Sequence, residues 1–212
     1  MERLAKKIAK SIGESLGKSE EDVAVVAYGL IGLLQFMAIF LLASLIGLVC
    51  SFWIEVVVVF LSVGFLRRLT GGAHSGGIYS CLVYSVFFVC ALSALARYVL
   101  STLPVTVNLA IAALIFVFGY VMIALKAPVT PPNKPCRTEA KRKRLRRGAF
   151  TILTVFLLLV AASFFLRSWH VRLYSVGLAL LLSTLWQIVM MTKAGLSFIS
   201  FFDGLFIRKK SK

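Results

Sequence analysis

Long apolar stretches recur along this chain, separated by short polar segments. The stretches cover residues 23–46, 50–66, 78–100, 105–125, 149–166 and 173–192. An α-helix needs roughly 20 apolar residues to cross the hydrocarbon core of a bilayer. The pattern therefore predicts an all-α, polytopic membrane protein with six transmembrane helices. The second stretch is short for a full crossing, and the turn before it must be tight, around Gly47 and Ser51.

The first 22 residues follow a different pattern. Leu4, Ile8, Ile12 and Leu16 recur every four residues, with lysines and a glutamate between them. A helix with this amphipathic pattern lies along a membrane surface. We predict a cytoplasmic interfacial helix over residues 1–22, a membrane domain over 23–192 and a basic cytoplasmic tail over 193–212.

The positive charge is unevenly distributed. The net charge is +16, and residues 1–22, 67–77, 126–148 and 193–212 hold 5, 2, 9 and 5 Lys or Arg, which is 21 of the 24. Basic loops stay in the cytoplasm, so both termini are predicted to lie there. With 60% hydrophobic residues and a mean hydropathy of +0.94, the expected partner is the lipid bilayer and not nucleic acid.

The longest predicted cytoplasmic loop, residues 126–148, has two halves. The first half holds four of the chain's five prolines, which favour an extended path. The second half holds the basic residues Lys141, Arg142, Lys143, Arg144, Arg146 and Arg147. Anchoring to the anionic leaflet is sufficient to explain this charge. Capture of an acidic peptide is the alternative.

Candidate chemistry is concentrated between Arg67 and Cys81, where four glycines and His74 precede the cysteine. On one continuous helix, His74 and Cys81 would be about 10.5 Å apart along the axis, which is too far for direct proton transfer. Gly76 and Gly77 permit a sharp turn. We therefore expect His74 to fold back toward Cys81, with the third span beginning near Ile78.

This placement would put Cys81 in or just after the first turn of a helix. The positive end of a helix dipole and a nearby imidazolium both favour a thiolate, and Arg67 adds positive potential. Backbone N–H groups of the glycine-rich loop are candidates for an oxyanion site. The alternative is a packing role, which is also the interpretation for Cys50, Cys90 and Cys136. No metal motif is present, and no cofactor is expected.

Polar residues inside the predicted spans suggest other roles. Glu55 is the only carboxylate within a span, but it lies roughly 16 Å from the cytoplasmic end, too far to orient His74. A transporter is the alternative function. It would use Glu55, Gln35, Asn108 and Arg97 as pathway groups.

Two motifs resemble the accessory gene regulator protein B (AgrB) peptidases. The first is Arg67 followed by Gly71-Gly72-x-His74 and Cys81, and the second runs from Ala127-Pro128 to Asn133-Lys134-Pro135. Length, hydropathy and basic loops are also similar, so the resemblance covers nearly the whole chain. The family processes a short precursor peptide for quorum sensing in Gram-positive bacteria.

The resemblance implies a cysteine endopeptidase at the cytoplasmic side of the bacterial plasma membrane. Cys81 would attack a precursor carbonyl with His74 as base, and the precursor's acidic C-terminal tail would leave. A precursor cysteine or serine would then close a thiolactone or lactone ring. The resemblance also implies a homodimer. Supporting residues would be Arg67, Gly71, Gly72, Gly76 and Gly77, and the tail would bind Lys134, Arg137, Lys141 and Arg142.

Overall fold

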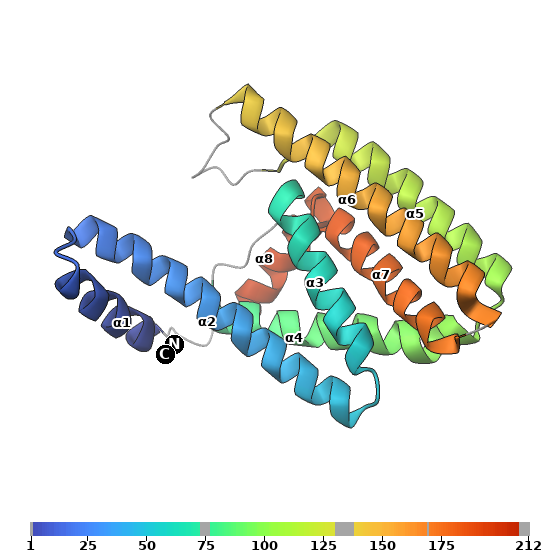
Figure 1. The fold of residues 1–212 in the computed structure, drawn as a ribbon, viewed down its shortest axis with the longest axis horizontal. Helices are drawn as coiled ribbons and strands as arrows, with labels where there is room; N and C mark the ends of the chain where they lie inside the picture. The colour runs from blue at the N-terminus through green and yellow to red at the C-terminus, as the bar shows by residue number, and fades with distance from the viewer. Residues whose placement is uncertain (1, 73–76, 130–137, 169, 208–212) are drawn as a thin grey trace.

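The computed structural model describes residues 2–72, 77–129, 138–168 and 170–207, and its regular elements there are helices. They are α1 (Glu2–Ser15), α2 (Glu20–Val49), α3 (Trp53–Thr70), α4 (Ile78–Ala94), α5 (Val105–Lys126), α6 (Glu139–Phe165), α7 (Val171–Val189) and α8 (Lys193–Ile207) (Figure 1). A π-helical turn and a 3₁₀ turn extend α4 to Thr102. The predicted all-α class is confirmed.

Within the described residues, five helical stretches are long and apolar enough to cross a bilayer. They are Glu20–Val49, Ile78–Thr102, Val105–Lys126, Glu139–Ser168 and Val171–Val189. Helix α3 has 18 residues and carries Glu55, Arg67 and Arg68 near its ends. At 1.5 Å per residue it extends about 27 Å, close to the hydrocarbon thickness of roughly 30 Å. A sixth span through α3 stays a prediction.

The tight turn expected around Gly47 and Ser51 joins α2 to α3. The N–H of Phe52 donates to the carbonyl of Gly47 at 2.9 Å, and Ser51 has a φ of 61°. A Cβ on Gly47 would be 3.0 Å from the Cα of Trp53, so the glycine permits the close approach of the two helices. Helix α3 then runs back along α2 (Figure 1).

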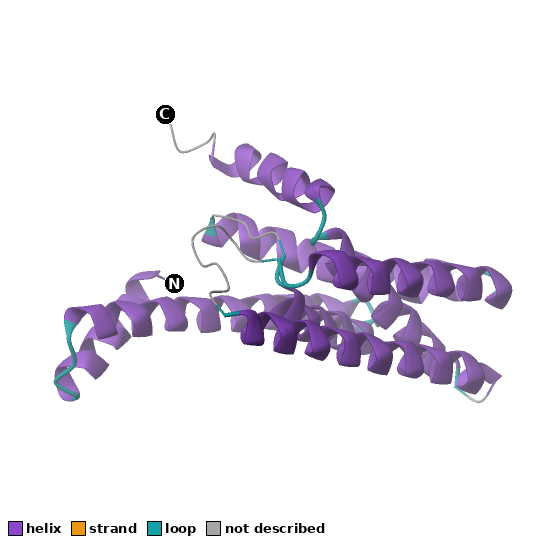
Figure 2. Ribbon diagram, turned by 90° about the horizontal axis from the view of Figure 1, so that it is seen from above, coloured by secondary structure: helices purple, strands orange, loops and turns teal. Residues whose placement is uncertain are grey.

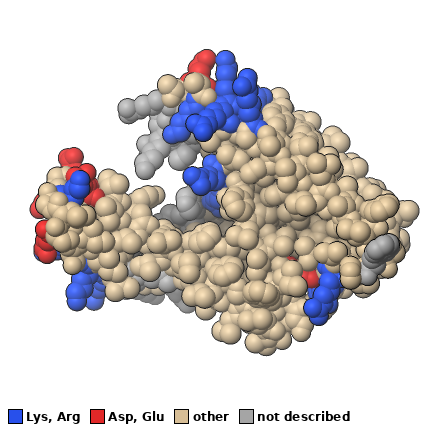
Figure 3. All heavy atoms as spheres, in the orientation of Figure 1, with Lys and Arg blue, Asp and Glu red and all other residues tan. Residues whose placement is uncertain are grey.

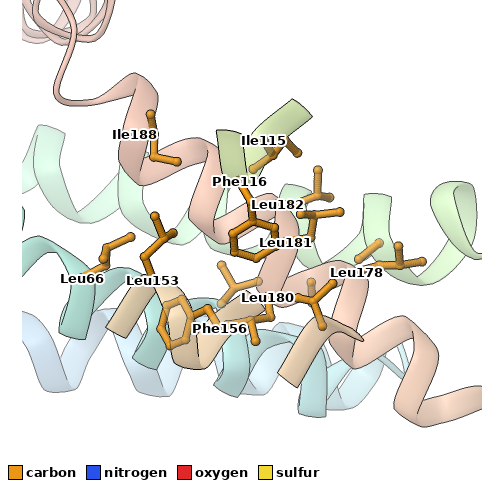
Figure 4. Close-up of a cluster of buried hydrophobic side chains, with 14 of the residues drawn as sticks. Leu66, Ile115, Phe116, Leu153, Phe156, Leu178, Leu180, Leu181, Leu182 and Ile188 are labelled. Atoms are coloured by element: carbon orange, nitrogen blue, oxygen red, sulfur yellow. The ribbon is translucent and has the colours of Figure 1, made fainter. Parts of the chain in front are cut away.

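Helix α7 lies at the centre of the bundle. It packs against α3, α5 and α6, and Figure 4 shows its leucines facing Phe116 of α5 and Leu153 and Phe156 of α6. Leu178 and Leu181 have no exposed surface. Most of its residues from Tyr174 to Ile188 are buried, including polar ones such as Ser175 and Gln187. The buried α7 therefore provides a fixed support for the ends of its neighbours.

Helices α1 and α2 form an arm that extends beyond the bundle, with α1 folded back along α2 (Figure 1). Ser19 caps α2 by accepting a hydrogen bond from the N–H of Asp22 at 3.3 Å. Ala5 and Ala9 are buried, whereas Leu4 and Leu16 are more than half exposed. These exposed leucines are available to a membrane surface, where α1 is predicted to lie.

Two segments predicted as loop and tail contain helices. Helix α6 begins at Glu139, so the basic half of residues 126–148 is helical. The reason is local, because no proline follows Pro135 there and alanine, lysine, arginine and leucine favour helix. Helix α8 occupies most of the predicted tail. Figure 2 shows it beside the main bundle, where Phe198 contacts the rings of Tyr84 and Trp186.

Candidate active site

A break in the helical structure separates Arg67 from Cys81. Helix α3 ends at Thr70 and α4 begins at Ile78, where the sequence predicted it to begin. Cys81 lies in the first turn of α4, and its N–H donates to the carbonyl of Gly77 at 3.0 Å. One continuous helix through this segment is therefore excluded. His74 and Gly76 lie outside the described residues, so the His74–Cys81 pair stays a prediction.

The thiol of Cys81 is half-buried beside polar groups from two helices. Its Sγ is 3.9 Å from the Oγ of Ser85, one turn further along α4. Arg67, in the last turn of α3, interacts electrostatically with both Cys81 and Tyr84. The guanidinium and the positive end of α4 thus lie on the same side of the bundle as the candidate nucleophile.

The bend that requires glycine lies at Gly71 and Gly72, whose φ angles are 71° and 129°. A Cβ on Gly71 would be 1.9 Å from the carbonyl oxygen of Val129, and one on Gly72 would be 3.2 Å from that of Met190. The sequence assigned the bend to Gly76 and Gly77. Gly77 is extended, with a φ of −106°, directly before α4, and Gly76 lies outside the described residues, so a turn at these two glycines stays a prediction.

The two sequence motifs meet at this bend. The N–H of Val129 donates to the carbonyl of Thr70 at 2.8 Å, and Gly71 and Val129 form a parallel β-bridge. Ala127, just before this contact, is 1% exposed. The start of the proline-rich segment is thereby attached to the end of α3. Lys134 and Arg137, further along the segment, lie outside the described residues.

Gln187 of α7 holds the bend from the bundle interior. Its Nε2 donates to the Oγ1 of Thr70 at 2.9 Å and to the carbonyl of Gly71 at 2.8 Å. The side chain is fully buried, and its Oε1 has no partner among the described residues. Sequence reasoning missed this residue. The sequence did contain a signal, an amide side chain within the last apolar stretch. Buried polar groups in membranes are costly, so such a side chain is expected to have a partner.

The basic start of α6 lies close to the end of α3. Figure 3 shows lysines and arginines gathered over this part of α6, and Gly148 packs against the side chain of Leu69. Leu69, Lys141 and Arg144 help to line a cavity of about 670 Å³. Arg142 is exposed but is not part of that lining. The structure thus brings Lys141 of the predicted tail-binding set to the cavity, together with Arg144.

Three of the polar groups considered for transport, Glu55, Arg97 and Asn108, lie at the opposite end of the bundle. Glu55 is 4% exposed, accepts a hydrogen bond from Ser175 Oγ at 2.6 Å and pairs with Arg97 at 3.7 Å. Asn108 Nδ2 donates to the Tyr174 hydroxyl and to the carbonyl of Leu100. Glu55 precedes Arg67 by 12 residues on α3, or about 18 Å. It lies far from Cys81, as expected.

Gln35, the fourth polar group considered for transport, is at the same end as Cys81. Its Nε2 donates from α2 to the carbonyl of Ile78 at 3.4 Å. Ile78 is the first residue of α4. Gln35 therefore helps to fix the start of the helix that carries the candidate nucleophile.

Comparison with known proteins identifies the relatives of this chain. The sequence is 29% identical over 199 residues to an AgrB-like protein of Clostridium perfringens strain SM101, with 92% of each chain covered. It is 28% identical over 199 residues to AgrB-like protein 2 of C. perfringens strain 13, with the same coverage. An AgrB-like protein of Halalkalibacterium halodurans is 29% identical over 160 residues, which cover 75% of this chain and 76% of the relative.

No solved structure matches this fold. The family described as Accessory gene regulator B matches residues 3–191, which include both motifs and every span-forming helix. This family is associated with peptide processing in the accessory gene regulator system of quorum sensing. The chain therefore belongs to the AgrB family and is a multi-pass membrane protein.

Proposed function

We propose that this protein is a membrane-embedded cysteine endopeptidase that removes the acidic tail of a short precursor peptide and cyclises the remainder. The observation that carries the proposal is the position of Cys81. It lies in the first turn of α4, on the far side of the break that begins at Gly71, and it interacts electrostatically with Arg67. Helix starts and nearby cations are the surroundings that activate cysteine nucleophiles.

The reaction has two acyl-transfer steps. His74 takes the proton of the Cys81 thiol, and the sulfur attacks the carbonyl carbon before the tail. The C–N bond breaks, the tail amine takes the proton, and a thioester to Cys81 remains. The thiol or hydroxyl of a precursor cysteine or serine then attacks the thioester carbonyl. A ring closes, and the Cys81 sulfur leaves and regains a proton.

Ring closure requires that water is kept from the thioester, because hydrolysis would release a linear peptide. Cys81 is half-buried on α4, a helix that packs against α2 and α3, and this setting supports the requirement. The acidic tail would lie toward the cavity beside Lys141 and Arg144. The basic residues at this end support a cytoplasmic location for it by the positive-inside rule.

The test is processing by the purified protein in liposomes of a candidate precursor peptide with a central cysteine or serine and an acidic tail. We expect Cys81→Ala and His74→Ala each to abolish cleavage. The matched control is Cys90→Ala, because Cys90 lies on the same helix with its Sγ near the carbonyl of Ala43. Mass spectrometry would detect the cyclic product and the acyl-enzyme. Cleavage that survives Cys81→Ala would refute the proposal.

A further inference from the structure

A cavity of about 140 Å³ begins one helical turn beyond Cys81, between α2, α3 and α4. Its walls are mainly apolar and include Phe36, Val63, Gly64, Phe88 and Trp186. An apolar cavity of about 150 Å³ can hold a benzene ring in another protein. The space therefore suits one large apolar side chain, such as that of phenylalanine, leucine or methionine.

Two residues connect this cavity to the candidate nucleophile. Ser85 lines the cavity, and its Oγ is 3.9 Å from the Sγ of Cys81. Arg67 also lines the cavity and interacts electrostatically with Cys81. A peptide whose carbonyl lies at Cys81 would therefore have a neighbouring side chain at the cavity entrance.

Aromatic contacts hold one wall in place. The rings of Phe88 and Trp186 stack with their centroids 4.2 Å apart, and Tyr84 lies 4.8 Å from Phe88. The Tyr84 hydroxyl donates to the Sδ of Met190 at 3.5 Å. Because these groups join α4 to the buried α7, the wall is supported from the bundle interior.

The cavity lies on the opposite face of α3 from the cavity beside the start of α6. Arg67 lines the first cavity and Leu69 lines the second. Residues two apart on a helix point about 200° apart. The end of α3 thus separates the two cavities, and the second has Lys141 and Arg144 in its lining, where an acidic tail could pair with them.

We propose that this cavity is the subsite for the precursor residue immediately before the cleaved bond, and that it selects a large apolar side chain there. This inference rests on the proposed function, because it assumes that the acyl group is transferred to Cys81. The acidic tail lies toward Lys141 and Arg144, and the retained segment lies toward Phe88 and Trp186.

Peptide aldehydes test the subsite without any cleavage. The Cys81 sulfur adds to the aldehyde carbon and the aldehyde oxygen takes a proton, so the thiol is protected from maleimide labelling. Replacing Cys50, Cys90 and Cys136 with alanine makes the labelling report Cys81 alone. Burial of a large apolar side chain strengthens binding, whereas glycine has no side chain to bury. We therefore expect peptides that end in phenylalaninal or leucinal to protect at concentrations at least about tenfold lower than one that ends in glycinal.

Gly64→Leu is designed to fill the cavity. A Cβ on Gly64 would have only the Phe36 ring nearby, at 4.0 Å, so a longer side chain can enter the space. We expect this variant to lose the preference for phenylalaninal while still binding glycinal. Gly64→Ala, which needs no rearrangement, should reduce the preference partly. The matched control is Gly29→Leu on α2, where nothing lies within 4 Å of the added Cβ.

Three outcomes would overturn the subsite. They are equal protection by all aldehydes, protection by none, and an apolar preference that persists in Gly64→Leu. The last result would mean that the apolar aldehydes are enriched by the lipid and not by the cavity. None of these outcomes affects precursor cleavage by the wild-type protein, so failure of the subsite is distinguishable from failure of the proposed function.

Discussion

The two ends of the bundle use their polar side chains differently. At the end where α3 and α7 begin, Glu55, Arg97 and Ser175 contact one another within helical segments. At the other end, Gln187 binds the backbone of a turn, and Cys81 lies beside a cavity. In the first set, helical side chains pair with one another, and Glu55 and Arg97 also line a cavity of about 210 Å³. In the second set, Gln187 holds a non-helical segment, and the neighbouring cavity lies beside a candidate nucleophile.

Because of this difference, we expect substitutions at one end of the bundle to change mainly the stability of the protein and substitutions at the other end to change mainly its activity. A buried charge that loses its partner remains desolvated, so the cost falls on the folded state. A side chain that holds a turn near a nucleophile affects the geometry of the reacting groups. Substitutions at the Glu55 end should therefore lower stability with little effect on the rate per folded molecule. Substitutions at the Cys81 end should do the reverse.

The largest expected effect on stability is that of Glu55→Ala. It leaves the charge of Arg97 without its partner in a setting where that side chain is 24% exposed. Breaking a buried ion pair costs about 3–5 kcal/mol, and we expect about 3 because Arg97 has partial access to solvent. Chemical denaturation in detergent would measure the loss, and cleavage per folded molecule should be retained.

Two variants sharpen this prediction. Arg97→Ala combined with Glu55→Ala should recover part of the stability, because neither charge is then buried alone. Glu14→Ala removes the exposed pair with Lys10 and should have little effect. Equal destabilisation by Glu14→Ala and Glu55→Ala would contradict the assignment of a structural role to the buried pair.

The largest expected effect on activity outside the catalytic pair is that of Gly71→Ala. The added Cβ would overlap the carbonyl oxygen of Val129, and the φ of 71° is unfavourable for alanine. Displacing a site by about 1 Å can reduce the rate by about a hundredfold. Cleavage kinetics would measure the loss. Gly32→Ala is the control, because its Cβ has nothing within 4 Å, and a wild-type rate in Gly71→Ala would refute the role of the bend.

Much of the Cys81 end could be predicted from local sequence. The glycines between Arg67 and Ile78 interrupt the apolar pattern, which is a local signal, and α4 begins at Ile78 as expected. The strict requirement for glycine at Gly71 and Gly72 was not predicted, because it arises from steric contact with Val129 and Met190. Those contacts come from segments far away in the sequence.

The hydrogen bonds between helices that hold each end of the bundle together could not be predicted for the same reason. Gln187 and Thr70 are 117 residues apart, and Ser175 and Glu55 are 120 residues apart. A polar residue in an apolar stretch signals that it needs a partner, but helix packing alone determines which one it has. The helix over residues 139–148 was also not predicted. The number of basic residues in a segment does not distinguish a loop from a helix that extends beyond the membrane.

A smaller loss of activity is expected from Gln187→Leu. This change removes both hydrogen bonds to Thr70 and Gly71 while nearly preserving the side-chain volume. Each lost buried hydrogen bond costs about 1 kcal/mol or more. Without these hydrogen bonds the turn is held less firmly near Cys81. We therefore expect kcat to fall about tenfold with KM unchanged.

Thr184→Val is the matched control for Gln187→Leu. It lies on the same helix and removes only a hydrogen bond to the carbonyl of Leu180 within α7. Cleavage kinetics of the two variants should therefore differ mainly in kcat. An unchanged kcat in Gln187→Leu, or an equal fall in Thr184→Val, would show that Gln187 does not position the turn.

The smallest expected effect concerns the basic start of α6. Lys141→Ala with Arg144→Ala removes the two charges that line the cavity beside Leu69, and we expect KM for an acidic-tailed precursor to rise about fivefold at low salt. Salt screens such contacts, so the difference from wild type should shrink as ionic strength rises. Arg142→Ala with Lys143→Ala removes the same charge from positions outside that lining, and a smaller rise is expected. Equal rises in the two double variants would mean that the patch attracts the tail through its total charge, and that the cavity does not bind it at defined positions.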